Sequence, residues 1–387
     1  MRLTILILIL NCTSALAYPN FISKGYHACL TCHYNPFGNG PLNDYGRAVS
    51  ASAISDRLFI SNDTTDELLA ERSGFLFSKP SQEYIRPSLD YRGMQLDQGI
   101  DQDKPTRRFI HMQMDATLTA KFGKANNYIA TFTHGIVPDN SARIIEGKKE
   151  ELNYAREYYI GYRPLPEIGV YFGKMDKIFG IRIPDHNLFH KSKGNLNQYS
   201  SSKGAMLHWG KKSFDFGIQY FNGIEDTEKT RAEETIGYTS KFEYSVADNL
   251  RIGFSFLDEK DADDNKKNMS ALSLKARVGK ASSIMIEAGQ INDSKTVSGK
   301  KSSQYLFMQN HLNIKRGLNF LFTYQYFQDD TKTNSEVFTF APGLQYYPWQ
   351  RVELRTEIQN QRSIDDNQDT PVIQDSWSLL SQVHLWF

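Results

Sequence analysis

The sequence is poor in cysteine, with three residues in 387: Cys12, Cys29 and Cys32. Residues 1–17 combine a basic start, a short apolar run and a small-residue exit, which predicts a secretory signal peptide. Cys12 is expected to leave with this signal, so the mature chain keeps two cysteines, three positions apart. Export places that pair in an oxidising compartment, where two bare thiols form a disulfide unless another group claims them.

The sequence also lacks long apolar runs and an excess of charge of either sign. Beyond residue 17 it contains no stretch of about 18 apolar residues, which excludes a transmembrane helix. The net charge of +1 gives no reason to expect nucleic-acid binding. What the chain has instead is 21 Tyr and 24 Phe in a sequence of low mean hydropathy. An exported, polar and aromatic-rich chain is typical of a transmembrane β-barrel, in which only every second strand residue faces lipid.

Alternating polarity begins near Tyr84 and continues to the C-terminus. In residues 110–120 apolar and polar residues alternate strictly, as in a strand with one face toward lipid. Short links such as residues 163–169 and 245–249 alternate with long polar ones, as periplasmic turns and extracellular loops do in outer-membrane barrels. The pattern predicts an all-β fold: a transmembrane antiparallel β-barrel of about 16 strands over residues 81–387, surrounded by the lipid of a bacterial outer membrane.

The two mature cysteines lie in the stretch CLTCH, which begins at Cys29. Two thiols at this spacing can each add to one vinyl group of a single haem, and the histidine directly after the second thiol then ligates the iron. The sequence therefore predicts one covalent haem c, with Cys29 and Cys32 as thioethers and His33 as axial iron ligand. A plain disulfide and a thiol redox pair remain alternatives. A zinc site would need more ligands than the neighbouring His27.

Residues 18–50 form the predicted haem segment, and residues 51–80 a linker or plug with one short capped helix that ends at Gly74. This stretch is shorter than the chain that an ordinary globular cytochrome uses to enclose a porphyrin. Residues of the barrel must therefore form part of the haem pocket. A barrel of about sixteen strands has a lumen that can admit a plug. We therefore expect the haem segment in the periplasmic mouth or the lumen, where it converts an open pore into an electron route.

The signal peptide, CLTCH followed by PLNDYGR (residues 41–47), and a predicted barrel that ends on Phe387 together resemble the fused monohaem cytochrome-porins of bacterial outer membranes. That family is best known from iron-oxidising bacteria. The resemblance implies transfer of single electrons between an extracellular donor or acceptor, with ferrous iron as one candidate, and a periplasmic electron carrier such as a cytochrome. It would make the chain an electron-transfer protein or an iron oxidase. No hydrolytic or transferase signature stands out in the sequence.

The sixth iron ligand is not evident from the sequence. His27 lies only two residues before Cys29, which makes reaching the opposite haem face awkward. By strand parity, further inward-pointing candidates are His111, His208, His384 and, more weakly, Met206. For each of them an ordinary polar lumen residue is the simpler interpretation.

One long link, residues 177–195, carries His186 and His190, whose spacing of four suits a metal if the segment is helical. This link could fold inward as a constriction, or bind a cation such as ferrous iron at the outer surface. An ordinary extracellular loop with solvated histidines is the simpler interpretation, because no third ligand accompanies the pair.

A different function remains open. The chain could be a passive diffusion porin for small solutes, in which Cys29 and Cys32 form a disulfide. A conduit must carry covalent haem and conduct ions poorly, whereas a porin must be colourless and leaky. In a third hypothesis the haem is only a relay, and a periplasmic multihaem protein supplies most of the route.

Overall fold

The structure of the 387-residue chain is a computed structural model. It describes residues 19–38, 40–58, 60–61, 63–79, 84–136, 153–185, 188–196, 200–223, 235–279, 281–296, 299–333, 335–365 and 372–387. The predicted signal peptide and His186 therefore lie outside the described residues.

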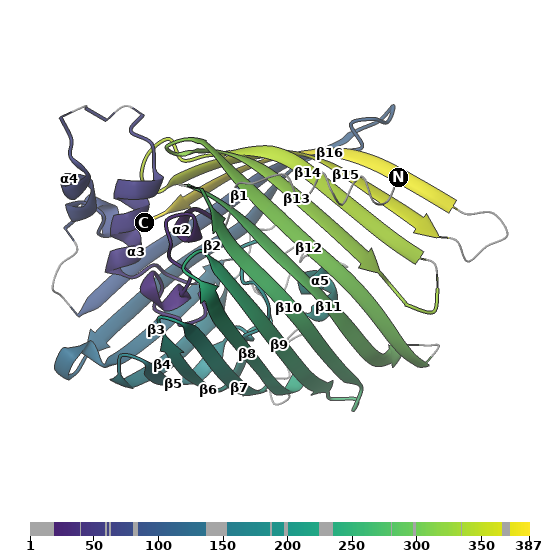
Figure 1. Cartoon of the computed structure of the whole chain (residues 1–387), viewed down its shortest axis with the longest axis horizontal. Helices are drawn as coiled ribbons and strands as arrows, with labels where there is room; N and C mark the ends of the chain where they lie inside the picture. Colours follow the sequence, from purple (N-terminus) through teal and green to yellow (C-terminus); the bar gives the residue numbers. More distant parts are fainter. Residues whose placement is uncertain are drawn as a thin grey trace.

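Within the described residues, sixteen strands form one closed antiparallel barrel, which Figure 1 shows from the side. The strands are β1 (Ile85–Gln98), β2 (Thr106–Phe122), β3 (Tyr128–Ile136), β4 (Asn153–Leu165), β5 (Ile168–Met175), β6 (Ser202–Lys211), β7 (Phe214–Asn222), β8 (Thr235–Ala247), β9 (Leu250–Asp261), β10 (Lys266–Val278), β11 (Ser282–Thr296), β12 (Gly299–Lys315), β13 (Leu318–Gln328), β14 (Ser335–Tyr346), β15 (Val352–Asp365) and β16 (Val372–Trp386). Each strand pairs with its neighbours along the chain, and β1 pairs with β16. The predicted all-β barrel of about 16 strands is confirmed.

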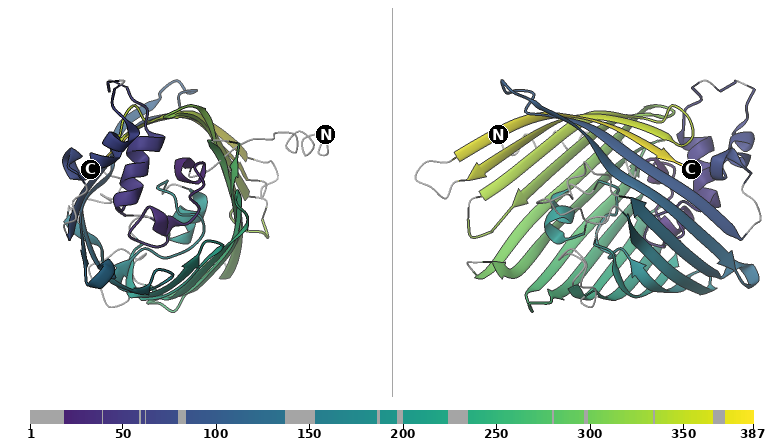
Figure 2. Two further views of the ribbon diagram at one scale, coloured as in Figure 1. Left: turned by 60° about the vertical axis from the view of Figure 1, so that its left-hand side comes forward. Right: turned by 180° about the vertical axis from the view of Figure 1, so that it is seen from behind.

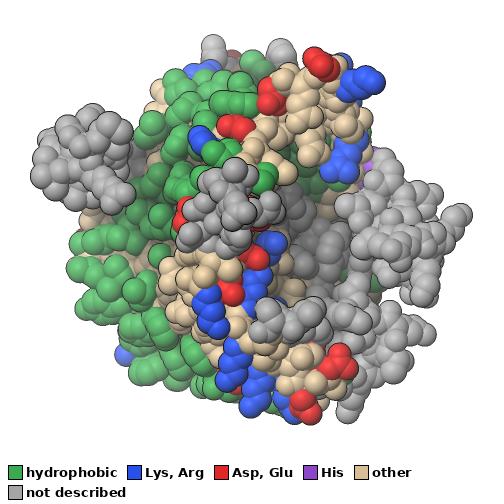
Figure 3. Space-filling view, turned by 90° about the vertical axis from the view of Figure 1, so that its right-hand side faces the viewer, with side chains coloured by type: hydrophobic (Ala, Val, Ile, Leu, Met, Phe, Trp, Pro, Cys, Tyr) green, Lys and Arg blue, Asp and Glu red, His purple; other side chains and the backbone are tan. Residues whose placement is uncertain are grey.

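The alternating pattern separates polar and apolar side chains onto the two faces of the barrel wall. On β2, Asp115 and Thr119 are buried on the lumen side, whereas Leu118 is 49% exposed on the outside. Figure 3, a view onto the end away from the N-terminal helices, shows hydrophobic side chains over one flank and charged ones around that end. An apolar exterior on a closed ring suits lipid, because lipid offers no partner to an open strand edge.

Strict alternation fails at one position of β2. The register with β1 shifts between Arg92 and Gly93, so the ladder skips one residue of β2. As a result, His111 lies on the same face of the wall as Tyr91 and Phe109. The Tyr91 hydroxyl lies 2.9 Å from Nδ1 of His111, and the ring of Phe109, which contacts His111, is exposed on the outside of the barrel. The inward orientation predicted for His111 is therefore wrong, because a β-bulge shifts the parity on which it rested.

The links at one end of the barrel are short, as predicted, but those at the other end are not all long. Only residues 262–265 separate β9 from β10, and β12 begins at Gly299, three residues after β11 ends at Thr296. At these places the strands extend through the polar stretches expected to be loops. The short links join β2 to β3, β4 to β5, β6 to β7, β8 to β9, β10 to β11, β12 to β13 and β14 to β15. In an antiparallel barrel these links share one end, which we call the short-turn end. The C-terminus and the N-terminal helices also lie at this end (Figure 1).

The chain before β1 forms the N-terminal segment, residues 19–79. Its helices are α2 (Pro19–Ile22), the 3₁₀-helix η1 (Cys29–Thr31), α3 (Asp44–Val49), the π-helix η2 (Ser50–Ile54), α4 (Asp66–Glu71) and the 3₁₀-helix η3 (Phe75–Phe77). The short capped helix predicted here is α4, in which the N–H of Leu68 donates to Thr65 Oγ1; the helix ends at Glu71, before the predicted end at Gly74. The boundary predicted after residue 50 falls where α3 continues directly into η2. None of the described helices is long and apolar enough to cross a membrane.

The N-terminal segment docks on the short turns and lies across the opening of the ring (Figure 2). The backbone N–H of Asp56 donates to the carbonyl of Tyr347, at 2.8 Å. In the β12–β13 turn, Arg316 Nε donates to the carbonyl of Ser55, at 2.7 Å. These contacts hold the segment to the wall through backbone groups at several points.

The long link between β5 and β6, residues 176–201, also enters the lumen; we call it the β5–β6 loop. It contains α5 (Phe189–Gly194), which lies inside the ring in Figure 1. The backbone N–H groups of Ile178 and Gly180 donate to Gln219 and Ser255 of the wall, both at 3.0 Å. Of the alternatives left open for this link, inward folding is the one that the structure shows.

Candidate functional site

The CLTCH stretch folds as one tight turn. The backbone N–H groups of Cys32 and His33 both donate to the carbonyl of Cys29, at 3.0 and 2.9 Å. Cys32 is buried and Cys29 half-buried. Both are free thiols, so the disulfide of the porin hypothesis does not join them in this structure.

Asn43 fastens this turn to helix α3. Its Oδ1 accepts a hydrogen bond from the N–H of Gly46 (2.9 Å), and its Nδ2 donates to the carbonyls of Leu30 (3.3 Å) and Thr31 (3.1 Å). Asparagine is among the preferred residues at a helix N-cap. Position 46 requires glycine because a Cβ there would collide with the backbone carbonyl of Cys32. The PLNDYGR stretch is therefore the support on which the CLTCH turn rests.

His33 is oriented by the backbone beside it. Its Nδ1–H donates to the carbonyl of Gly40 at 3.3 Å, and His33 forms an isolated antiparallel bridge with Leu42. A neutral imidazole with its proton on Nδ1 carries its lone pair on Nε2. Metal-ligating histidines typically donate their other N–H to such a carbonyl, which fixes the ring and its tautomer. The geometry therefore suits ligation through Nε2.

Cys29, Cys32 and His33 all line one cavity, between the N-terminal segment, the barrel wall and the β5–β6 loop. The two thiols and the imidazole that a c-type haem requires thus face one space, and the residues present fit that group. Among the described residues, no group of three or more His, Cys, Asp and Glu side chains could hold a metal ion directly.

Burial changes the acidity of the Cys32 thiol in the folded chain. Burial, with a smaller effect of the nearby Cys29, raises the pKa of Cys32 to about 12. The thiolate is the reactive form of cysteine, so burial lowers the reactivity of Cys32.

His27 and His208 both hydrogen-bond to neighbouring residues. His27 Nε2 lies 3.1 Å from the carbonyl oxygen of Asp248, in the β8–β9 turn. His208 is fully buried, with Nε2 3.0 Å from the carboxylate of Asp215. The inward orientation predicted for His208 is confirmed, and its pairing is that of an ordinary polar lumen residue.

His384 and Met206 also face inward as predicted. His384 lies between two carboxylates, with Nδ1 3.0 Å from Glu353 and Nε2 3.2 Å from Asp90. Met206 packs in an apolar cluster that includes Phe37 of the N-terminal segment. Both ring nitrogens of His384 are thus occupied.

His190 is enclosed inside the barrel. It is 2% exposed, and its ring stacks on Tyr305 at 5.3 Å and meets Phe307 at 5.7 Å. Within the described chain neither ring nitrogen has a hydrogen-bond partner. The outer-surface iron site considered for His186 and His190 is therefore wrong for His190, because the loop that carries it folds inward.

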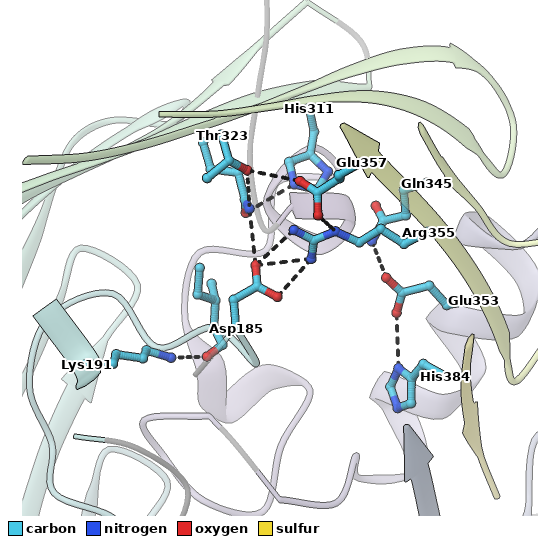
Figure 4. A network of polar contacts seen from close by, with 11 residues as sticks. Asp185, Lys191, His311, Thr323, Gln345, Glu353, Arg355, Glu357 and His384 are labelled. Carbon is cyan, nitrogen blue, oxygen red and sulfur yellow. Dashed lines mark hydrogen bonds and ion pairs between the residues drawn. The ribbon is translucent and has the colours of Figure 1, made fainter. Parts of the chain in front are cut away.

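Figure 4 shows a polar network that sequence reasoning missed. Asp185 of the β5–β6 loop pairs with Arg355 of β15 at 2.9 Å, and Arg355 also contacts Glu357 at 2.7 Å. Gln309 donates to Asp185 at 3.3 Å. Arg355 and Asp185 lie 170 positions apart in the chain, so no local pattern could have joined them.

No protein-family model matches the sequence, and no curated protein matches it either. Solved structures do match. One is the anion-selective porin from Comamonas acidovorans, with a TM-score of 0.60 and 10% identity over 78% of this chain and 99% of that chain. OmpT of Vibrio cholerae matches with a TM-score of 0.59 and 10% identity, over 78% of this chain and 97% of that chain. OprB of Pseudomonas putida matches with a TM-score of 0.57 and 9% identity, over 87% of this chain and 100% of that chain. This chain therefore has the fold of outer-membrane porins.

Proposed function

We propose that the chain is an outer-membrane barrel whose N-terminal segment carries one covalent c-type haem and passes electrons between an extracellular donor or acceptor and a periplasmic carrier. One observation carries the proposal: Cys29, Cys32 and His33 line a single cavity inside the barrel, and His33 is oriented as metal-ligating histidines are. The apolar flank of the closed ring and its porin-like fold support the outer membrane as the location.

A bound haem supplies reversible one-electron chemistry at its iron. The chain's own residues hold and orient that group. Cys29 and Cys32 anchor it through thioethers, and His33 binds the iron through Nε2. Gly40 and Asn43 hold the ring and the turn, which limits reorganisation when the charge changes.

The position of the cavity defines which partners reach it. Short turns of outer-membrane barrels face the periplasm, so a periplasmic cytochrome has direct access to the N-terminal segment. The hydrocarbon core is about 30 Å thick, more than one haem spans. An extracellular donor such as ferrous iron must therefore enter the lumen from the long-loop end, or pass its electron through a second carrier.

A passive diffusion porin is the second candidate, and the structural neighbours support it better than the first. One of them is named an anion-selective porin, and the loop inside the lumen of this chain would narrow such a pore. In this hypothesis the CLTCH turn has no cofactor, and the N-terminal segment acts only as a partial plug.

A pyridine haemochrome spectrum and a haem-stained denaturing gel on the outer-membrane fraction separate the two candidates. The natural chain is compared with Cys29→Ala/Cys32→Ala and with Thr31→Ala, which keeps both thiols and His33. Covalent haem in the natural chain and in Thr31→Ala, lost in the double variant, is expected. A colourless natural chain from cells with working haem maturation, together with steady ion conductance in planar bilayers, would contradict the haem proposal and support the diffusion porin.

A further inference from the structure

Five arginines line the cavity that contains the CLTCH turn, and their charges are balanced in two different ways. Three belong to the wall or the β5–β6 loop and each pair with a carboxylate. The pairs are Arg92–Asp90 (3.8 Å), Arg156–Asp115 and Arg182–Asp176 (2.5 Å). The other two, Arg47 of α3 and Arg351 of the β14–β15 turn, form no ion pair with any described carboxylate.

Arg351 is enclosed where the N-terminal segment meets the wall. It is 5% exposed, and its Nη2 donates to the carbonyls of Arg72 (3.3 Å) and Gly74. Its guanidinium lies 4.5 Å from the ring of Phe77, while its Nε is buried with no hydrogen-bond partner in the described structure. The carbonyls and the ring position this side chain but do not neutralise it.

Arg47 is buried to a similar degree, at 7% exposed. It donates to two backbone carbonyls, at 3.3 and 2.8 Å. The nearby carboxylate of Asp44 is already held by Arg86 at 2.8 Å and by Lys121 at 3.1 Å. The charge of Arg47 is thus left without a carboxylate of its own.

The charge of Arg47 also acts on Arg351. Burial and the charge of Arg47 lower the pKa of Arg351 to about 10. The chain ends nearby, since the Phe387 ring lies 5.7 Å from the Arg351 guanidinium, but no ion pair joins the terminal carboxylate to Arg351 in the described structure. A buried charge is costly unless it is paired, so two of them on one cavity wall favour the binding of an anion there.

We propose that Arg47 and Arg351 form a binding site for a carboxylate inside the cavity that Cys29, Cys32 and His33 line. The planar guanidinium matches a carboxylate in two parallel hydrogen bonds, which suits arginine to this task. The identity of the carboxylate rests on the proposed function: with haem on the two thiols, it is a haem propionate. Without haem, it is a free carboxylate from solution. The site is complete only when the N-terminal segment is docked, because each arginine comes from a different side of the junction.

The test compares Arg47→Gln, Arg351→Gln and the double variant with Arg316→Gln as a matched control. Arg316 also ties a short turn to the N-terminal segment, through the carbonyl of Ser55 (2.7 Å) and the carboxylate of Asp66 (2.9 Å). It is absent from the lining of the cavity. Its loss therefore reports on docking alone. Heat-modifiable migration on gels checks that every variant forms the barrel.

The first measurement is the midpoint potential of the haem in each purified protein. A cation near a propionate favours the reduced state, because reduction adds an electron close to that charge. We expect a lower potential in both single variants, the lowest in the double variant, and no change in Arg316→Gln. Equal potentials in all of them would overturn the carboxylate site, while the presence of covalent haem would still support the proposed function.

A natural chain without haem would overturn the proposed function but not yet this site. Isothermal titration with acetate then tests the arginine pair by itself. Binding that is lost in the double variant and kept in Arg316→Gln would support a site for a free carboxylate. The same result for the natural chain and the double variant would overturn it.

Discussion

Two segments of the chain occupy the lumen and its opening, and their buried polar groups are paired in different ways. The β5–β6 loop is satisfied by the barrel: Lys177 pairs with Glu259 at 2.5 Å, and Asp185 pairs with Arg355 at 2.9 Å. The N-terminal segment docks through backbone carbonyls and through ion pairs such as Asp66–Arg316 (2.9 Å), but it leaves two thiols, an imidazole and Arg47 facing a cavity.

This difference indicates a structural role for the β5–β6 loop and a ligand-binding role for the N-terminal segment. Buried polar groups in proteins are nearly always paired, so a segment whose charges all find partners needs nothing more for stability. The β5–β6 loop is of this kind at its charged anchors, and it narrows the lumen. The N-terminal segment places unpaired buried arginine charge beside the CLTCH turn, which is the arrangement expected of a part that is completed by a ligand.

The largest effect on stability is expected from Arg355→Leu, which breaks the anchor of the β5–β6 loop. Asp185 would then lack its cation, and breaking a buried pair costs about 3 kcal/mol at the lower end of the usual range. The lower end applies because 21% of the Asp185 side chain is exposed. Thermal unfolding followed by circular dichroism measures the loss, and Arg362→Leu, at an exposed position of the same strand, is the control. The haem content should not change. Its loss would show that the two segments depend on each other.

A smaller and more local effect is expected from Asn43→Ala. Loss of an N-cap costs about 1 kcal/mol, and here the same side chain also holds the carbonyls of Leu30 and Thr31. We expect less covalent haem per chain while the barrel stays folded. Thr65→Ala removes the equivalent cap of α4, away from the CLTCH turn, and is the matched control. Equal haem content in the two variants would contradict the supporting role of Asn43.

The smallest effect is expected from His190→Phe. Both ring nitrogens of His190 are buried without a hydrogen bond among the described residues, so an apolar ring that keeps the stacking on Tyr305 should be neutral or slightly stabilising. The free energy of unfolding should rise by about 1 kcal/mol or less. An altered haem absorption spectrum in this variant would instead identify His190 as an iron ligand and would link the loop to the N-terminal segment.

Strand alternation and link lengths were enough to predict the barrel, because a two-residue period places Leu118 outside and Thr119 inside whatever the partner strands are. The haem site stays a prediction; it could be named from the sequence because two thiols and a histidine at this spacing are local in the chain. Contacts such as Asp185–Arg355 could not be predicted from the sequence, because their partners are brought together only by closure of the ring. His111 was misplaced because a one-residue bulge leaves no mark in the polarity pattern. The unpaired state of Arg351 likewise depends on which carboxylates lie near it in space.

The central claim is that the N-terminal segment binds a covalent haem, whereas the β5–β6 loop is held in the lumen by ion pairs with the barrel wall. Mass spectrometry of the proteolysed protein, purified from cells with working haem maturation, tests this most directly. The peptide containing Cys29 and Cys32 is expected to carry the mass of one haem in the natural chain and in Arg355→Leu, and none in Cys29→Ala/Cys32→Ala. Unmodified thiols or a disulfide on that peptide in the natural chain would contradict the account.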